Sequence, residues 1–495
     1  MLILFDSGHY LQYVKIFENR AAFATWDIVR GPSFPVLIHL SNIFFGKTAM
    51  GLLIFSFIFY LIMLFFSKKI LDIASKGNKK TKNILIILFF LLVIINPIIY
   101  GYYHSLLTEF VAMTVSVMSC FFAWKLFETV ENDKKPHFIL LSLYFIIMVP
   151  LAYFLKQPFV SIALFPLIAV VFLALIGLKS WQKKLQIVSV FFISLITLVS
   201  SITVWNGVLK SKGIELNSGN ESTNILGYRL IAGLNRFNFE GNFSAITYDK
   251  FEVLDNKGKV IGKMQIENNK SGLTSAFSGI KFLINAISRY PDKVFNSYLN
   301  NYLGISNVYR YNKEGFILDN KTKSPKFEIL ACRQNCIIAT GINNEKSNIF
   351  HMTPELYEEV VDYEQKIDPP FLFKLLFNLN EKPSIFFVNL LMISLPFVWM
   401  SSLVFLLCQV RKDKKQKIQN PTRLYMVFIL LTYSLLHILV HVVTATIIDR
   451  YASPTYIAII LADLLLLAEL IEVCKGRKNF KETTKKIKSK LLKYS

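Results

Sequence analysis

Seven polar side chains that could take part in catalysis or bind an anion lie beside long apolar stretches of this 495-residue sequence. They are Asp6, Arg30, His104, Glu109, Lys156, Arg450 and Tyr451. A carboxylate can take a proton from a hydroxyl or an amine, and a lysine or arginine can stabilise a departing phosphate. Because charges close to hydrocarbon are costly, such residues are first candidates for function. The set indicates a reaction at a membrane surface on a molecule with an anionic head group.

The charged members of the set also have purely structural interpretations, and the residues alone leave both open. Asp6 precedes Ser-Gly-His and could cap a following helix, whereas Glu109 could be favoured by the dipole at a helix N-terminus. Arg30 could anchor its turn to a lipid phosphate or pair with nearby Asp27. Lys156 and Arg450 could extend their charged groups to lipid phosphates as ordinary membrane anchors.

The elements that must position these residues are apolar stretches of about twenty residues, the length that crosses roughly 30 Å of hydrocarbon as a helix. Hydrophobic residues make up 53% of the sequence and charged residues only 18%. These values exclude a soluble enzyme, a disordered chain and a small disulfide scaffold. We predict nine spans, at 47–67, 83–101, 106–124, 138–155, 158–178, 186–205, 384–410, 424–447 and 454–474.

Positive charge is concentrated in alternate connections between these spans. The net charge is +22, yet 27 of the 55 basic residues and only 6 of the 33 acidic ones lie in 68–82, 125–137, 179–184, 411–423 and 475–495. The positive-inside rule predicts that these segments are cytoplasmic. The basic excess is therefore interpreted as an orientation signal, and no nucleic-acid partner is expected.

The predicted fold is a polytopic α-helical membrane protein with about nine transmembrane helices and an extracytoplasmic α+β domain. Met1–Phe5 is too short to cross a membrane, so we expect that a first transmembrane helix ends at Phe5 and that its beginning is missing. The predicted regions are a first extracytoplasmic loop with amphipathic helices (1–46), a bundle of six spans (47–205), an extracytoplasmic soluble domain (206–383), three C-terminal spans (384–474) and a basic cytoplasmic tail (475–495).

The extracytoplasmic regions also contain local patterns. Tyr10–Arg20 has the mixed polarity of a helix lying at the membrane interface, and Pro35–Phe45 is apolar and roughly helical. Phe251–Ile266 predicts short strands. Lys281–Leu303 repeats apolar residues with a helical period and is interrupted by Pro291.

Three further features have weaker functional interpretations. Cys332 and Cys336 lie in the predicted soluble domain, where they could form a disulfide in an oxidising compartment or remain reduced. His437 and His441 share one helix face and could ligate a metal, but they lack the glutamate of a zinc-protease motif. Asp463 is interpreted as a buried hydrogen-bonding or paired group rather than a catalyst.

Four short motifs, in this order, carry a resemblance to a known family. They are Asp6-Ser-Gly-His-Tyr10 followed by Arg30-Gly-Pro-Ser-Phe-Pro35; Tyr102-Tyr-His-Ser-Leu-Leu-Thr-Glu109; Lys156-Gln-Pro158; and Asp449-Arg-Tyr-Ala-Ser-Pro454. In order and spacing the set resembles the C-type (GT-C) glycosyltransferases. More narrowly it is similar to the branch that holds the protein O-mannosyltransferases and the bacterial aminoarabinose transferase of lipid A.

The resemblance implies a sugar donor linked to polyprenyl phosphate and inverting transfer to a glycan, lipid or protein acceptor at the outer face of the membrane. Asp6 would activate or position the acceptor, and Glu109 would support the same cavity. Lys156 and Arg450 would bind the phosphate as it leaves. The family's usual Asp-Glu pair is Asp6-Ser7 here, which weakens the case for a metal site with two carboxylates. A divalent metal, Mg²⁺ or Mn²⁺, stays open as a cofactor, with Asp6 and Glu109 as candidate ligands. The implied substrate-binding residues are Arg30, His104, Lys156, Arg450 and Tyr451.

Three alternatives compete with this prediction. A polysaccharide polymerase or O-antigen ligase also combines many spans with a large external loop. A lipid-linked sugar transporter would place charges along a path through the bilayer, whereas the candidate charges here gather at one predicted face. An assembly factor with a partner-binding domain is the third. The Lys-, Asn- and Ile-rich composition indicates a bacterial cytoplasmic membrane as the location.

Overall fold

The computed structural model describes most of the hydrophobic part of the chain. The described residues are 5–18, 23, 31–74, 79–94, 96, 99, 103, 108–133, 135–214, 243–245, 250–255, 259–265, 272–306, 371–411, 421–443, 452–469 and 471. Every structural statement below concerns these ranges.

The chain is a multi-span α-helical membrane protein. Among the described residues, eight helices are long and apolar enough to cross a bilayer. They lie in α3 (Ala49–Ala74), α6 (Thr108–Glu131), α7 (Lys135–Leu155), α8 (Ser161–Gly177, preceded by the short 3-10 helix η2, Gln157–Val160), α9 (Trp181–Ser211), α18 (Phe371–Arg411), α19 (Pro421–Val443) and the helix Ala452–Glu469. Eight of the nine predicted spans are thereby matched. The remaining one, 83–101, coincides with a shorter helix, α4 (Lys79–Ile94).

The centre of the bundle is formed by α6, α19 and Ala452–Glu469, in which most side chains are buried. The surrounding helices α3, α7, α9 and α18 instead expose large apolar residues; Phe386 and Phe397 of α18, for example, are more than two-thirds exposed. Because all these helices are apolar, hydropathy does not distinguish them. The share of buried side chains shows which helices are surrounded by other helices and which have a face toward lipid.

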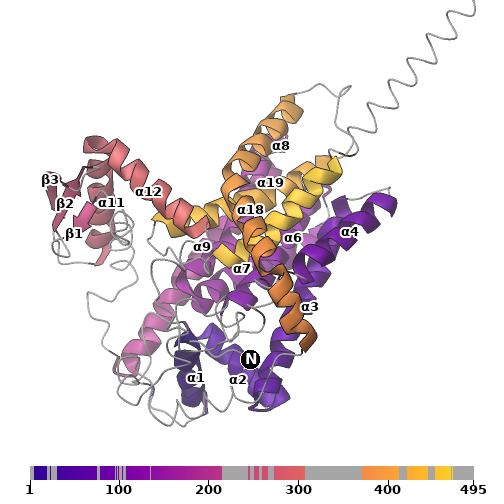
Figure 1. The fold of residues 1–495 in the computed structure, drawn as a ribbon, viewed down its shortest axis with the longest axis horizontal. Helices are drawn as coiled ribbons and strands as arrows, with labels where there is room; N and C mark the ends of the chain where they lie inside the picture. Colours follow the sequence, from indigo (N-terminus) through magenta and orange to yellow (C-terminus); the bar gives the residue numbers. More distant parts are fainter. Residues whose placement is uncertain are drawn as a thin grey trace, which may run out of the picture.

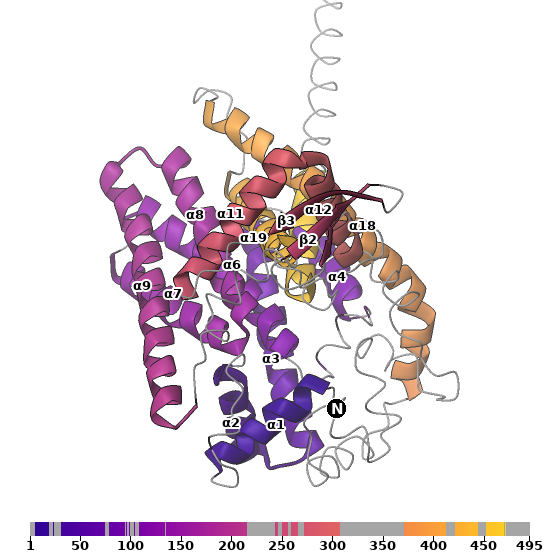
Figure 2. The same cartoon turned by 90° about the vertical axis from the view of Figure 1, so that its left-hand side faces the viewer.

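Two helices precede the first span, as the sequence predicts. They are α1 (Phe5–Phe17) and α2 (Ser33–Phe45), which lie side by side next to the beginning of α3 (Figures 1 and 2). The Tyr10 ring packs edge-on against Phe34 at 4.8 Å, and Phe34 packs against Phe110 of α6 at 5.9 Å. The first helix begins earlier than the predicted Tyr10, so Asp6 lies in its first turn.

The predicted strands and the helix broken at Pro291 are also present. An antiparallel three-stranded sheet contains β1 (Phe243–Ala245), β2 (Lys250–Leu254) and β3 (Val260–Gln265). It is followed by α11 (Gly272–Arg289) and α12 (Pro291–Ser306). Their small core contains Val253, Met264, Phe282, Ala286 and Val294. Figure 1 shows the sheet and α11 apart from the bundle, with α12 leading from them toward α18 and α19.

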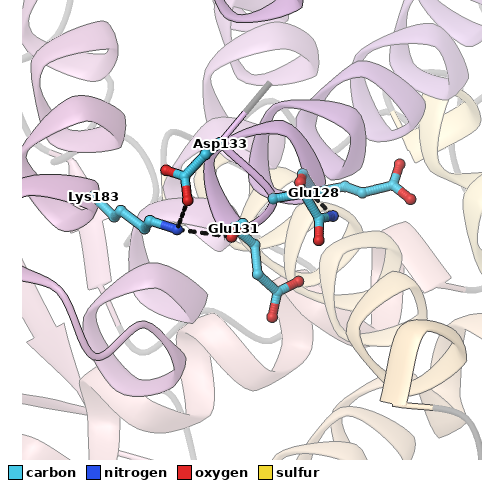
Figure 3. Close-up of polar contacts among 5 residues, drawn as sticks. Glu128, Glu131, Asp133 and Lys183 are labelled. Atoms are coloured by element: carbon cyan, nitrogen blue, oxygen red, sulfur yellow. Dashed lines mark hydrogen bonds and ion pairs between the residues drawn. The ribbon is translucent and has the colours of Figure 1, made fainter. Parts of the chain in front are cut away.

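One end of the bundle is held together by charged contacts in the segments predicted to be cytoplasmic. Lys183, at the start of α9, donates to the Asp133 carboxylate at 2.7 Å and to the Glu131 carbonyl at 2.8 Å (Figure 3). Asp133 adopts a positive φ of 57° in the turn between α6 and α7. Aspartate tolerates this left-handed conformation better than most residues. The Lys183 side chain therefore joins the turn to α9.

A second contact at the same end joins the last two described spans. Arg423, in the first turn of α19, is only 1% exposed and donates to Glu469 at 2.7 Å. A guanidinium that is removed from water requires an anionic acceptor, because burying an uncompensated charge is costly.

We expect Glu469→Gln to lower the free energy of unfolding by about 1.5–3 kcal/mol, because the buried guanidinium loses its charged acceptor. The matched control is Glu128→Gln, which breaks a more exposed pair with Lys125 on the same helix and should cost at most about 1 kcal/mol. Thermal unfolding of the purified variants in detergent measures both. Equal shifts for the two variants would contradict a special role for the Arg423 pair.

Candidate functional site

The opposite end of the bundle contains an ion pair between two of the predicted site residues. Glu109, in the first turn of α6, lies 3.4 Å from the Lys156 ammonium, with Oε1 as the acceptor. Thr108 donates its hydroxyl to Oε2 of the same carboxylate at 3.1 Å. The Glu109 side chain is 0% exposed, whereas that of Lys156 is 16% exposed. The lysine is therefore the accessible partner. We call this the Glu109 end of the bundle.

Lys156 is held in place by the chain on both sides of it. Its own backbone is extended and separates α7 from η2. Its N–H donates to the Ala152 carbonyl, and its carbonyl accepts from the Phe159 N–H at 2.7 Å. Pro158 suits the first turn of the 3-10 helix because its ring fixes φ and it has no N–H to satisfy. The ammonium lies 5.6 Å from the centre of the Phe159 ring, a cation–π contact.

The turn after the predicted Arg30 also reaches this end. Gly31 lies so close to the last turn of α7 that a Cβ atom there would stand 2.1 Å from the Phe154 carbonyl oxygen. Only glycine permits that approach. Gly31, which follows Arg30 in the sequence, therefore packs against Phe154, two positions before Lys156.

The sequence prediction missed a second polar contact beside Lys156. Ser161, at the start of α8, and Nδ1 of His437 on α19 are hydrogen-bonded at 2.6 Å. The His437 ring lies 6.3 Å from Phe159 and 4.7 Å from His441. Both histidines and the serine are buried. Nothing local in the sequence marks Ser161, because its partner is 276 positions away; the spacing of the histidines identified only a shared face.

An aromatic residue completes the packing around the start of α6. Tyr103 contacts Phe110 at 6.1 Å and shares a hydrogen bond with the Thr114 hydroxyl at 3.0 Å. Burial raises the pKa of the Tyr103 phenol well above its ordinary value, because the charged form would lose its hydration. The phenol is therefore neutral and provides hydrogen bonding rather than charge.

The structure thus brings together Glu109 and Lys156 among the seven predicted residues. Asp6 is placed only through its helix, since its side chain lies outside the described part. The last helix is also near α6: Ser116 donates to the Pro454 carbonyl at 2.8 Å. Outside the described residues lie Arg30, His104, Arg450, Tyr451, Cys332 and Cys336.

A divalent metal at Glu109 stays a prediction, because the side chain of Asp6, the other candidate ligand, lies outside the described residues. One carboxylate oxygen faces an ammonium and the other accepts from a hydroxyl. A cation such as Mg²⁺ prefers several oxygen ligands, yet within the described ranges no cluster of three or more metal-ligating side chains is found. The contact with Lys156 also suits Glu109 to a role in holding the lysine.

Comparison with models of protein families, with curated proteins and with solved structures finds no match to this chain.

Proposed function

We propose that this protein is a membrane glycosyltransferase that moves a sugar from a polyprenyl-phosphate donor to a glycan, lipid or protein acceptor. The observation that carries the proposal is the Glu109–Lys156 pair, in which a buried carboxylate contacts the ammonium of a lysine whose side chain is partly exposed at a helix end. A cation held this way is preorganised to bind a phosphate and requires little rearrangement during the reaction. The outer face remains the predicted location, on the basis of the charge distribution.

In the proposed reaction, an acceptor hydroxyl attacks the anomeric carbon of the donor sugar. The new carbon–oxygen bond forms as the bond to the phosphate oxygen breaks, and the electron pair leaves with the polyprenyl phosphate. Lys156 stabilises the negative charge that gathers on this phosphate. The acceptor proton passes to the carboxylate of Asp6, and attack opposite the leaving group inverts the anomeric centre. Glu109 acts through Lys156 as a positioning residue.

The position of the polar contacts near helix ends favours a transferase over a transporter. A transport path requires polar groups across the depth of the bilayer. The Glu109–Lys156 pair lies instead where α6 begins and α7 ends, and the Ser161–His437 contact lies at the start of α8 and within the last two turns of α19. These groups all lie near helix ends rather than along the full length of a span.

We expect a strain without this protein to lose a sugar-sized mass from a surface glycolipid or glycoprotein. Parent protein should restore that mass, and Asp6→Asn should not, because the amide cannot take up the acceptor proton. Mass spectrometry of both fractions makes the comparison and identifies the acceptor.

The matched control is Asp133→Asn, an exposed aspartate at the other end of the bundle, which should restore the parent profile. Restoration by Asp6→Asn would remove Asp6 from the site. An unchanged glycan profile in the deletion strain would contradict the proposed transfer.

A further inference from the structure

The small domain formed by the sheet, α11 and α12 exposes an apolar stripe that the proposed reaction does not use. On α12, Phe295 is 65% exposed and Leu299 is 41% exposed. These residues are four positions apart and therefore share one helix face. Val294, the neighbour of Phe295, is buried in the core of the domain. The stripe therefore lies on a different side of α12 from the face that packs on the sheet.

The same stripe leads directly to the membrane-spanning helices. Tyr302 follows Leu299 by three positions, so it continues the stripe by one turn. Its hydroxyl donates to the Met392 carbonyl at 2.5 Å. Met392 lies within the first two turns of the span Phe386–Leu407. One end of the stripe is therefore seated against a transmembrane helix.

A second hydrogen bond places this contact at a boundary of the bilayer. Asn301 donates to the Val442 carbonyl at 3.1 Å, and Val442 is next to the last residue of the span Thr422–Val443. Two helices that run in opposite directions thus meet α12 near the same ends. Beside Met392, Leu390 and Ile393 of α18 remain exposed, as expected for side chains that face lipid.

We propose that the Phe295–Leu299 stripe of α12 rests in the lipid surface beside α18. The stripe ends at Tyr302, whose contact with Met392 lies beside the exposed Leu390 and Ile393 of α18, and this argues for lipid rather than for a second protein. A helix of this kind buries its apolar side at the boundary between head groups and acyl chains. The lipid surface then serves as the third support of the small domain, beside α18 and α19.

The test places the photoreactive residue benzoylphenylalanine at Phe295 of the full chain, an aromatic replacement at an exposed site. The protein is reconstituted in vesicles of phosphatidylcholine and phosphatidylglycerol, irradiated and analysed by mass spectrometry. We expect a lipid adduct at position 295. The matched control is the same residue in place of Asn285, which is exposed on a polar side of α11 and should give severalfold less lipid adduct.

Three results would overturn the proposal. One is a covalent dimer, which would identify a second copy as the occupant. Another is an adduct to a different segment of the same chain. The third is an equal yield of lipid adduct at 285 and 295, which would indicate random collisions. A repeat at Leu299 uses a second site on the stripe and must agree with the result at Phe295.

Discussion

Replacing Lys156 by methionine is expected to reduce sugar transfer at least about a hundredfold, the usual scale for removing one preorganised group that stabilises developing charge. Methionine retains most of the apolar stem and removes the ammonium, together with its cation–π contact to the Phe159 ring. The loss should appear as the missing glycan mass described above, measured in cells that contain the variant at parental abundance.

The same substitution should also destabilise the protein. Glu109 is fully buried, and removing one member of a buried ion pair typically costs about 3–5 kcal/mol. Adding Glu109→Gln neutralises the buried carboxylate, so the double variant should regain most of the lost stability while remaining unable to transfer sugar. This separation distinguishes phosphate binding from a purely structural ion pair. Thermal unfolding in detergent and glycan analysis together measure it.

Lys183→Met is the matched control for this experiment. Lys183 pairs with an exposed aspartate at the other end of the bundle, and surface pairs contribute about 0–1 kcal/mol. Transfer should therefore stay at the parental level. Full activity of the Glu109→Gln, Lys156→Met double variant would contradict the proposed role of Lys156.

Gly31→Ala is expected to be among the most damaging glycine-to-alanine changes at the described glycines. The new Cβ atom would lie 2.1 Å from the Phe154 carbonyl oxygen and 2.5 Å from its Cα atom. Both are backbone atoms, which cannot rotate away as a side chain does. The turn must therefore separate from α7, at a cost of about 1–3 kcal/mol or more, and the contact beside Lys156 opens.

The control for this prediction is Gly207→Ala on α9, where an added Cβ meets no described atom within 4 Å. That change should be neutral or should stabilise the helix by up to about 1 kcal/mol, because alanine is the better helix former. Thermal unfolding and glycan analysis of both variants measure the difference. If Gly31→Ala behaves like Gly207→Ala, the close packing of the turn on α7 is wrong.

The hydrophobic pattern predicted most of the fold because membrane helices follow from length and composition alone. It also identified the hairpin strands and the break at Pro291. It overestimated the span 83–101, since the apolar residues continue past Ile94, where α4 ends. It also placed the start of the first helix too late. Helix ends depend on local hydrogen bonds, which hydropathy does not report.

The candidate site was only partly predictable. Glu109 and Lys156 stand out because charges are rare beside apolar stretches, and the structure pairs them. Which of the two side chains is the more exposed could not be predicted, because that depends on how α6, α7 and α8 pack. Ser161 and the exposed face of α12 were not identified. Nothing local in the sequence distinguishes this serine or this amphipathic helix from others, and their roles depend on residues far away in the chain.

The short length of α4 has a consequence for the lipid itself. Its 16 residues extend about 24 Å at 1.5 Å per residue, less than the roughly 30 Å of a typical hydrocarbon core. A bilayer accommodates such mismatch by thinning locally around the helix. We therefore expect the bilayer to be thinner beside α4 than beside the longer described spans.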